Sequence, residues 1–160
     1  MGFHTKYISK ITCRLVSFSF CLILAAAPSF GSLGDDVSSV RSDQAHINAS
    51  LRTSQTSAYS VDELQTPTGT VIREFASPAG RIFAVSWQGS SLPDLQQLLG
   101  AHFEDFQRAV KAQNRRPVGG PLYVQQNGLV VEIGGHMRSI RGRAYLPDEV
   151  PAGVRVEDLP

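Results

Sequence analysis

Two arginines and a tyrosine near the C-terminal end of the sequence have the spacing of an anion-binding surface. Arg141, Arg143 and Tyr145 occur at every second position, so a strand over this segment places their side chains on one face and Arg138 on the other. Such a face can recognise an anionic ligand or an acidic partner. Charges that protect an edge strand from aggregation are the alternative interpretation. We predict a ligand- or partner-binding surface here.

His136 is the one histidine that the sequence places beside a carboxylate on an adjacent strand. Glu132 precedes it by four residues, and we expect a turn at the two glycines between them. Glu63, Glu74 and Glu132 could share acid and base roles with His136, because such groups need only be close in space. This is the chemistry of a small hydrolase.

Trp87 ends an alternating strand and is followed by the segment GSSLP. A nucleophilic serine at a strand-to-helix turn needs a G-x-S-x-G motif and a nearby base, and neither is visible here. We therefore expect Ser90 and Ser91 to have a structural role. Trp87 shares its predicted face with Phe83 and Val85, which favours a core residue over a platform for ligand stacking. Both alternatives stay open, and Trp87 is kept among the candidate binding residues.

The sequence lacks the common motifs that hold metals or nucleotides. It has no H-E-x-x-H, no calcium loop, no G-x-x-x-x-G-K-[ST] and no G-x-G-x-x-G. We predict no metal site and no cofactor.

The first 31 residues have the pattern of a secretory signal peptide. Three basic residues and no acidic residue occur in MGFHTKYISKITCR, which is followed by the apolar run LVSFSFCLILAAA. As a helix this run rises about 20 Å, less than the roughly 30 Å of a membrane core, so we predict no integral membrane anchor. We expect cleavage between Gly31 and Ser32, and a periplasmic or secreted protein.

Removal of the signal peptide changes the cysteine content and the charge. Cys13 and Cys21 both lie within it, so we predict no disulfides in the mature chain. Three of the 15 basic residues and none of the 14 acidic residues leave with it, so the mature net charge is 12 − 14 = −2. We expect no nucleic-acid partner, and instead an unknown protein or envelope component.

Apolar periodicity divides the mature chain into helices and strands. It predicts one helix over residues 35–52 and a second from Pro93 to about Ala112, capped by Ser91 or Leu92. The segment TSQTS is interpreted as a linker. Turns are predicted at TPTG, SPAG and Asn127-Gly128. Strands are predicted within residues 57–65, 70–77, 81–88, 122–126, 129–135 and 136–147.

These elements predict an α+β fold. We expect a single domain over residues 32–146, with two helices on one face of a mainly antiparallel sheet, and a Pro-rich tail over 147–160 on the surface. The helix starts near 36 and 93 and the turn glycines at 69 and 128 and at 80 and 135 are offset by 57, 59 and 55 residues. This near-constant offset predicts a tandem αβββ pseudo-repeat with six strands.

The central block ELQTPTGTVIREFASPAGRIFAVSWQG, together with LPDLQQLLG and GRAYLP, resembles a family of small exported proteobacterial proteins, domain of unknown function 2844. The resemblance covers essentially the whole mature chain. It implies export from the cytoplasm, and it brings no established activity, ligand or catalytic residue.

Two functions therefore stay open. The first is a non-catalytic periplasmic binding or accessory module, favoured by the missing catalytic motifs and the arginine-rich last strand. The second is a small periplasmic hydrolase that uses carboxylates and His136.

Overall fold

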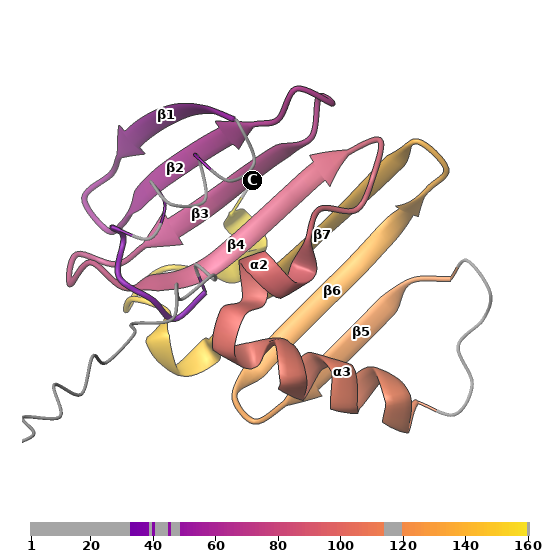
Figure 1. The fold of residues 1–160 in the computed structure, drawn as a ribbon. Coiled ribbons are helices and arrows are strands. Elements are labelled where there is room, and N and C mark those ends of the chain that lie inside the picture. The colour runs from indigo at the N-terminus through magenta and orange to yellow at the C-terminus, as the bar shows by residue number, and fades with distance from the viewer. Residues whose placement is uncertain (1–32, 39, 41–44, 46–48, 114–119, 160) are drawn as a thin grey trace, which may run out of the picture.

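The computed structural model describes residues 33–38, 40, 45, 49–113 and 120–159. Within these residues the chain forms an α+β domain on one antiparallel sheet, with the strand order β1-β2-β3-β4-β7-β6-β5 (Figure 1). The strands are β1 (Ser50–Gln55), β2 (Ser60–Gln65), β3 (Val71–Ala76), β4 (Ile82–Gly89), β5 (Leu122–Gln126), β6 (Leu129–His136) and β7 (Ser139–Tyr145).

Tight turns join the strands of each hairpin, and the predicted turns are confirmed at three places. The TPTG turn is closed by a hydrogen bond from Gly69 N to Thr66 O, and the SPAG turn by one from Gly80 N to Ser77 O. The turn between β5 and β6 has φ values of 50° and 77° at Asn127 and Gly128, the left-handed conformations that two-residue hairpin turns require.

The turn between β6 and β7 lies later than the sequence predicts. β6 continues through both glycines to His136, which pairs with Ser139, and the chain reverses at Met137 and Arg138. Gly135 allows a close approach of the two strands instead of a turn, because a Cβ at this position would lie 2.1 Å from the Ser139 carbonyl oxygen. His136 therefore ends β6 and does not open β7, and Arg138 lies in the turn and not on the strand.

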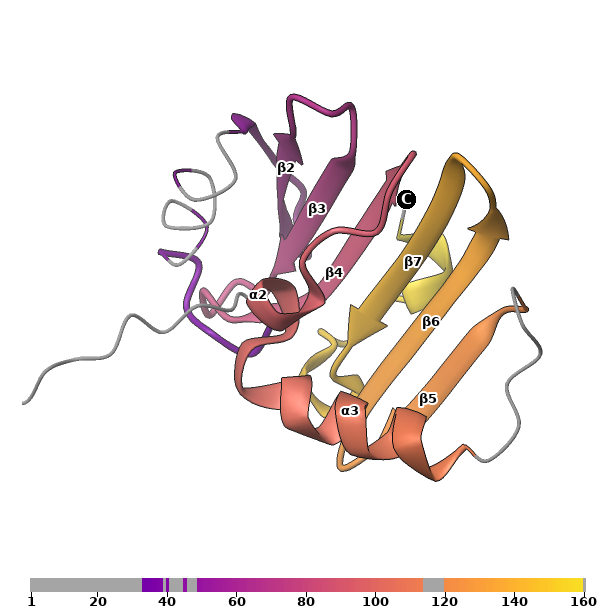
Figure 2. The ribbon, with the colours of Figure 1, turned by 45° about the vertical axis from the view of Figure 1, so that its right-hand side comes forward.

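A helical segment covers one face of the sheet and confirms the helix predicted from Pro93 to Ala112. It consists of α2 (Leu95–Leu99), a 3₁₀ turn η1 (Gly100–His102) and α3 (Phe103–Ala112). α3 packs against β5 and β6 (Figures 1 and 2). We call the covered side of the sheet the helix face and the other side the outer face.

The N-terminus of this helical segment is capped by Asp94. Its Oδ1 accepts hydrogen bonds from the backbone N–H groups of Gln96 at 2.9 Å and Gln97 at 3.2 Å. The predicted caps Ser91 and Leu92 are wrong, because the chain enters the helix two to three residues later and an aspartate there satisfies two free N–H groups.

β1 is the element that the sequence analysis missed. The segment interpreted as the end of a helix and a linker is an edge strand that pairs with β2. Its side chains are mostly exposed and polar, so no alternation of apolar residues marks it. The described sheet therefore has seven strands and not six.

The two-helix arrangement and the pseudo-repeat stay predictions. Eight residues of the predicted helix over residues 35–52 lie outside the described residues, and residues 50–52 belong to β1. The sheet order places β4 and β7, the last strands of the two predicted units, side by side. This order is compatible with two strand meanders that meet at their third strands.

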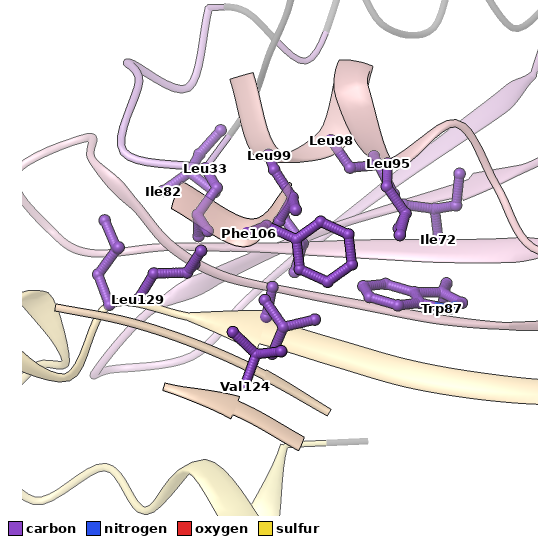
Figure 3. Close-up of a cluster of buried hydrophobic side chains, with 14 of the residues drawn as sticks. Leu33, Ile72, Ile82, Trp87, Leu95, Leu98, Leu99, Phe106, Val124 and Leu129 are labelled. Atoms are coloured by element: carbon purple, nitrogen blue, oxygen red, sulfur yellow. The ribbon is translucent and has the colours of Figure 1, made fainter. Parts of the chain in front are cut away.

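The main core lies between the helical segment and the sheet. Figure 3 shows leucines of α2 and Phe106 of α3 close to the side chains of the central strands. Trp87 is part of this core, with 2% of its surface exposed. The buried members labelled in the figure are Leu33, Ile72, Ile82, Trp87, Leu95, Leu98, Leu99, Phe106, Val124 and Leu129.

A β-bulge moves Phe83 to the outer face. Between two successive residues of β3 the partner on β4 changes from Ala84 to Ile82, so Phe83 is the extra residue. It packs in a small cluster on the outer face, whereas Val85 and Trp87 lie beneath the helices. The prediction that Phe83 shares their face is wrong, because strict alternation does not hold through a bulge.

The C-terminal segment packs against the outer face. It contains two 3₁₀ turns, η2 (Pro147–Glu149) and η3 (Val156–Asp158), and η3 lies on the side of the sheet away from α2 and α3 (Figure 2). Val150, Val154 and Leu159 contact the outer-face cluster around Phe75 and Phe83. The tail predicted to lie on the surface thus covers part of the sheet.

Gly142 provides a test of this packing. A Cβ at this position would lie 2.4 Å from Trp87 Cζ2 and 2.6 Å from the Glu132 carbonyl oxygen. We expect Gly142→Ala to lower the free energy of unfolding by about 1–3 kcal/mol, the usual cost of overpacking. The midpoint of urea denaturation measures this loss.

Gly134→Ala is the matched control, because a Cβ at Gly134 would meet no atom within 4 Å. We expect a change within about 0.5 kcal/mol for this substitution. Equal losses in the two variants would contradict the packing described here.

Asp105 links α3 to the turn between β5 and β6. Asn127 Nδ2 donates to Asp105 Oδ1 at 2.8 Å, and Arg108 also bonds this carboxylate. The hydrogen bond from Asn127, aided by Arg108, lowers the pKa of Asp105 below its ordinary 3.8. A carboxyl group whose pKa is lower in the folded state than in the unfolded state stabilises the fold at pH values above its unfolded-state pKa. This stabilisation is lost as the pH falls through its folded-state pKa.

We therefore expect Asp105→Asn to lower the urea midpoint at pH 7, with a deficit that shrinks as the pH falls below 3.8. Parallel urea titrations at pH 7 and near pH 3 measure it. A deficit that is the same at both pH values would show that the carboxylate charge has no part in this contact.

Candidate functional site

One row of side chains crosses the whole sheet on the outer face. Each member is the cross-strand partner of the next, through all six strand pairs. Neighbouring strands lie about 4.8 Å apart, so these side chains form a continuous band. From β1 to β5 this polar row contains Arg52, Glu63, Arg73, Ser86, Arg143, Glu132 and Tyr123.

Ser86, in the middle of the polar row, stands between two arginines that are each bound to a glutamate. Arg73 Nε lies 2.8 Å from Glu63 Oε2, and Arg143 Nε lies 2.8 Å from Glu132 Oε2. The arginine side chains are only 25% and 27% exposed. Each ion pair thus holds a guanidinium group in one orientation on its side of Ser86.

The C-terminal segment adds a second constraint on Arg143. Its Nη1 donates to the backbone carbonyl of Val156 at 3.0 Å. The guanidinium group is therefore held from two directions, by a glutamate on β6 and by the tail. A guanidinium group has five N–H donors, so both arginines keep donors for a further acceptor.

A second row lies next to the polar row, toward the end of β4. Gln88 pairs with Arg141, and Arg141 pairs with Gly134 on β6. Arg141 is exposed and forms no ion pair within the described part of the chain. A Cβ at Gly134 would meet no atom within 4 Å, so the outer face of the sheet is uncovered beside Arg141.

The two rows line a groove of about 540 Å³, which we call the arginine groove. This volume lies within the range of small-molecule sites, roughly 300–1,000 Å³. Its polar lining residues are Arg73, Ser86, Gln88, Glu132, Arg141 and Arg143, and its apolar lining includes Pro121, Tyr123 and Leu159.

A family model described as a protein of unknown function (DUF2844) matches residues 29–159. The chain belongs to this family. No curated protein and no solved structure matches it. Membership in the DUF2844 family confirms the predicted family, and it assigns no activity or ligand. Export and a proteobacterial source stay predictions.

Within the described ranges, no three side chains of His, Cys, Asp and Glu lie close enough together to hold a metal ion. None of the helices in this part of the chain is long and apolar enough to span a membrane. The two cysteines lie outside the described residues.

The predicted face of Arg141, Arg143 and Tyr145 is present, but its members have different surroundings. Arg141 and Arg143 line the arginine groove. Tyr145 instead packs with the cluster around Phe83. Burial raises the pKa of the Tyr145 phenol, and Glu132 adds to this shift, so the group stays neutral at physiological pH.

Trp87 does not present its ring to the groove. Its side chain lies on the helix face and is 2% exposed, so only its backbone, between Ser86 and Gln88, can contribute to the groove lining. The structure thus places Trp87 in the core, which was the favoured of the two interpretations.

His136 and the three candidate carboxylates do not come together. His136 is exposed at the end of β6, and Glu132 lies four residues earlier on the same strand, roughly 13 Å away along the chain. The predicted contact between them is wrong, because β6 continues through the glycines to His136 and does not turn there. Glu63 and Glu132 are bound to arginines, and Glu74 lies on the helix face with 1% exposure.

Arg73, Ser86 and Gln88 are site residues that the sequence analysis missed. Arg73 interrupts an apolar strand with a charge, and this was the one visible signal. Arg73 lies opposite Ser86 across the β3–β4 hairpin. The place of Ser86 opposite Arg143 depends on the pairing of β4 with β7, two strands that are distant in the sequence.

Proposed function

We propose that this protein is exported and acts as a non-catalytic binding or accessory module in the periplasm or outside the cell. In this proposal the arginine groove is the binding surface, and the ligand or partner is an anionic envelope component or protein. The signal-peptide pattern of residues 1–31 supports export. The single observation that carries the binding role is the pair Arg73 and Arg143, held on either side of Ser86.

The charge of the groove favours an anion. Three arginines and two glutamates, Glu63 included, give a local charge of 3 − 2 = +1. Arginine binds carboxylates and phosphates through paired N–H donors, so oriented guanidinium groups are suited to such ligands. A purely structural role for these ion pairs explains less, because ion pairs that are partly exposed to solvent contribute little to stability.

The hydrolase alternative has less support. A general acid and base must both reach the reacting atoms. His136 and Glu74 lie far from the groove centre or on the other face, and the two remaining carboxylates are held by arginines. We therefore keep the binding module as the proposal.

Export is tested by the N-terminus of the mature protein. Expression of the full chain should give a periplasmic or secreted product that begins at Ser32, as measured by mass spectrometry of cell fractions. Leu22→Arg, which places a charge in the apolar run, should leave the product in the cytoplasm with residues 1–31 intact. Cytoplasmic, uncleaved wild-type protein would contradict export.

Anion binding is tested by thermal shift with an acidic peptide, polyphosphate, anionic phospholipid vesicles and short carboxylates. A ligand at 100 times its dissociation constant adds about 2.7 kcal/mol, which raises the melting temperature by several degrees. At least one of these probes should give such a shift with the wild type.

Two charge-reversal variants test whether the anion binds in the arginine groove. Arg141→Glu changes the groove, and we expect it to remove the shift. Arg52→Glu changes the same polar row at the edge strand, outside the groove lining, and should keep the shift. Shifts that survive in Arg141→Glu would place the binding elsewhere.

A further inference from the structure

We propose that the arginine groove binds a small amphipathic carboxylate, with the carboxylate between Arg73 and Arg143 and the apolar part along the β5 side of the groove. This inference rests on the proposed binding function and names its ligand class. It follows from the positions of the arginines, the local charge, the apolar lining and the size of the groove.

The headgroup position follows from the register. Arg73 on β3 and Arg143 on β7 are separated only by β4, so their strands lie about 10 Å apart. The residue between them is Ser86, whose small side chain is one of the groove's lining residues. Two long side chains that flank Ser86 on either side can both donate Nη hydrogen bonds to one carboxylate.

The orientation of the guanidinium groups agrees with this position. Both use their Nε atoms for the glutamates on their outer sides. The Nη atoms are the part of the guanidinium group left for an acceptor, apart from the one bond from Arg143 to the tail. Arg141, in the adjacent row, adds a third cation that no described acid neutralises.

A monoanion matches the charge of this groove. The local charge of 3 − 2 = +1 balances one carboxylate. A phosphate monoester carries a charge of about −1.5 to −2 at neutral pH, which would leave negative charge uncompensated. The groove therefore favours a carboxylate or another monoanionic headgroup over a phosphate monoester.

An apolar surface begins on the β5 side of the same groove. Tyr123 is two strands from Arg143 in the polar row, about 10 Å away, and is 54% exposed. Pro121 and Leu159 are further apolar lining residues. An eight-carbon chain bound at the arginines can reach this surface, and the volume of 540 Å³ suits such a ligand.

Octanoate is the first probe, titrated into protein purified from cells that express the full chain. Saturable binding in calorimetry is expected. Acetate lacks the chain and octyl glucoside lacks the charge, so each should bind at least tenfold more weakly. Hexanoate lacks two CH₂ groups and should bind roughly fifteenfold more weakly than octanoate, because each buried CH₂ contributes about a fourfold gain.

Three variants locate the ligand. Arg73→Met should weaken octanoate binding about tenfold or more, by loss of a charge-assisted hydrogen bond. Gly134→Leu fills open space in the groove without a change of charge and should abolish binding. Arg52→Met removes a charge from the same row outside the groove and should bind as the wild type does. Urea midpoints confirm that each variant is folded.

The outcomes separate this inference from the proposed function. No saturable octanoate binding, equal binding of octyl glucoside, or full binding by Gly134→Leu would overturn the carboxylate ligand. If the acidic peptide or phosphatidylglycerol vesicles bind and Arg141→Glu abolishes that binding, the module stands with a macromolecular ligand. If no anionic probe depends on the groove, both proposals fail.

Discussion

The pairing of β4 with β7 is the interaction on which the rest of the structure depends. These strands come from separate hairpin systems, and their pairing joins the two halves of the sheet. A slip of one residue would exchange the faces of every side chain on β7. The observed register puts Gly142 beneath Trp87 in the core and Arg143 beside Ser86 on the outer face. One contact thus sets both the packing of the helix face and the composition of the groove.

The charged residues of the polar row then determine which groups in the groove can bind an anion. Like charges across a sheet repel, and Ser86 separates the two inner arginines of the polar row while a glutamate flanks each on its outer side. The ion pairs orient the guanidinium groups more than they stabilise the fold. The tail, through the carbonyl of Val156, fixes one of them further. An anion entering the groove therefore meets donors that are already ordered, which lowers the entropic cost of binding.

Local signals in the sequence predicted local structure well, but they did not predict which distant strands pair. Asn127-Gly128 and the two Pro-x-Gly turns could be recognised because their backbone conformations select their residue types. β1 was missed because an exposed polar edge strand carries no apolar alternation, and Phe83 was misplaced because a bulge leaves no sequence mark. Two of the groove arginines, Arg141 and Arg143, were predicted as binding residues from the sequence. Arg73 and Ser86 were not, because their place beside Arg143 depends on registers between distant strands.

The central claim is that the register of the sheet makes an anion site from the arginines around Ser86. NMR detection of the arginine Nε–H signals during an octanoate titration measures this directly. The signals of Arg73, Arg141 and Arg143 should shift with one common saturation curve, while that of Arg52 stays in place. Equal, non-saturating shifts at all arginines, or no shift at the three groove arginines, would contradict it.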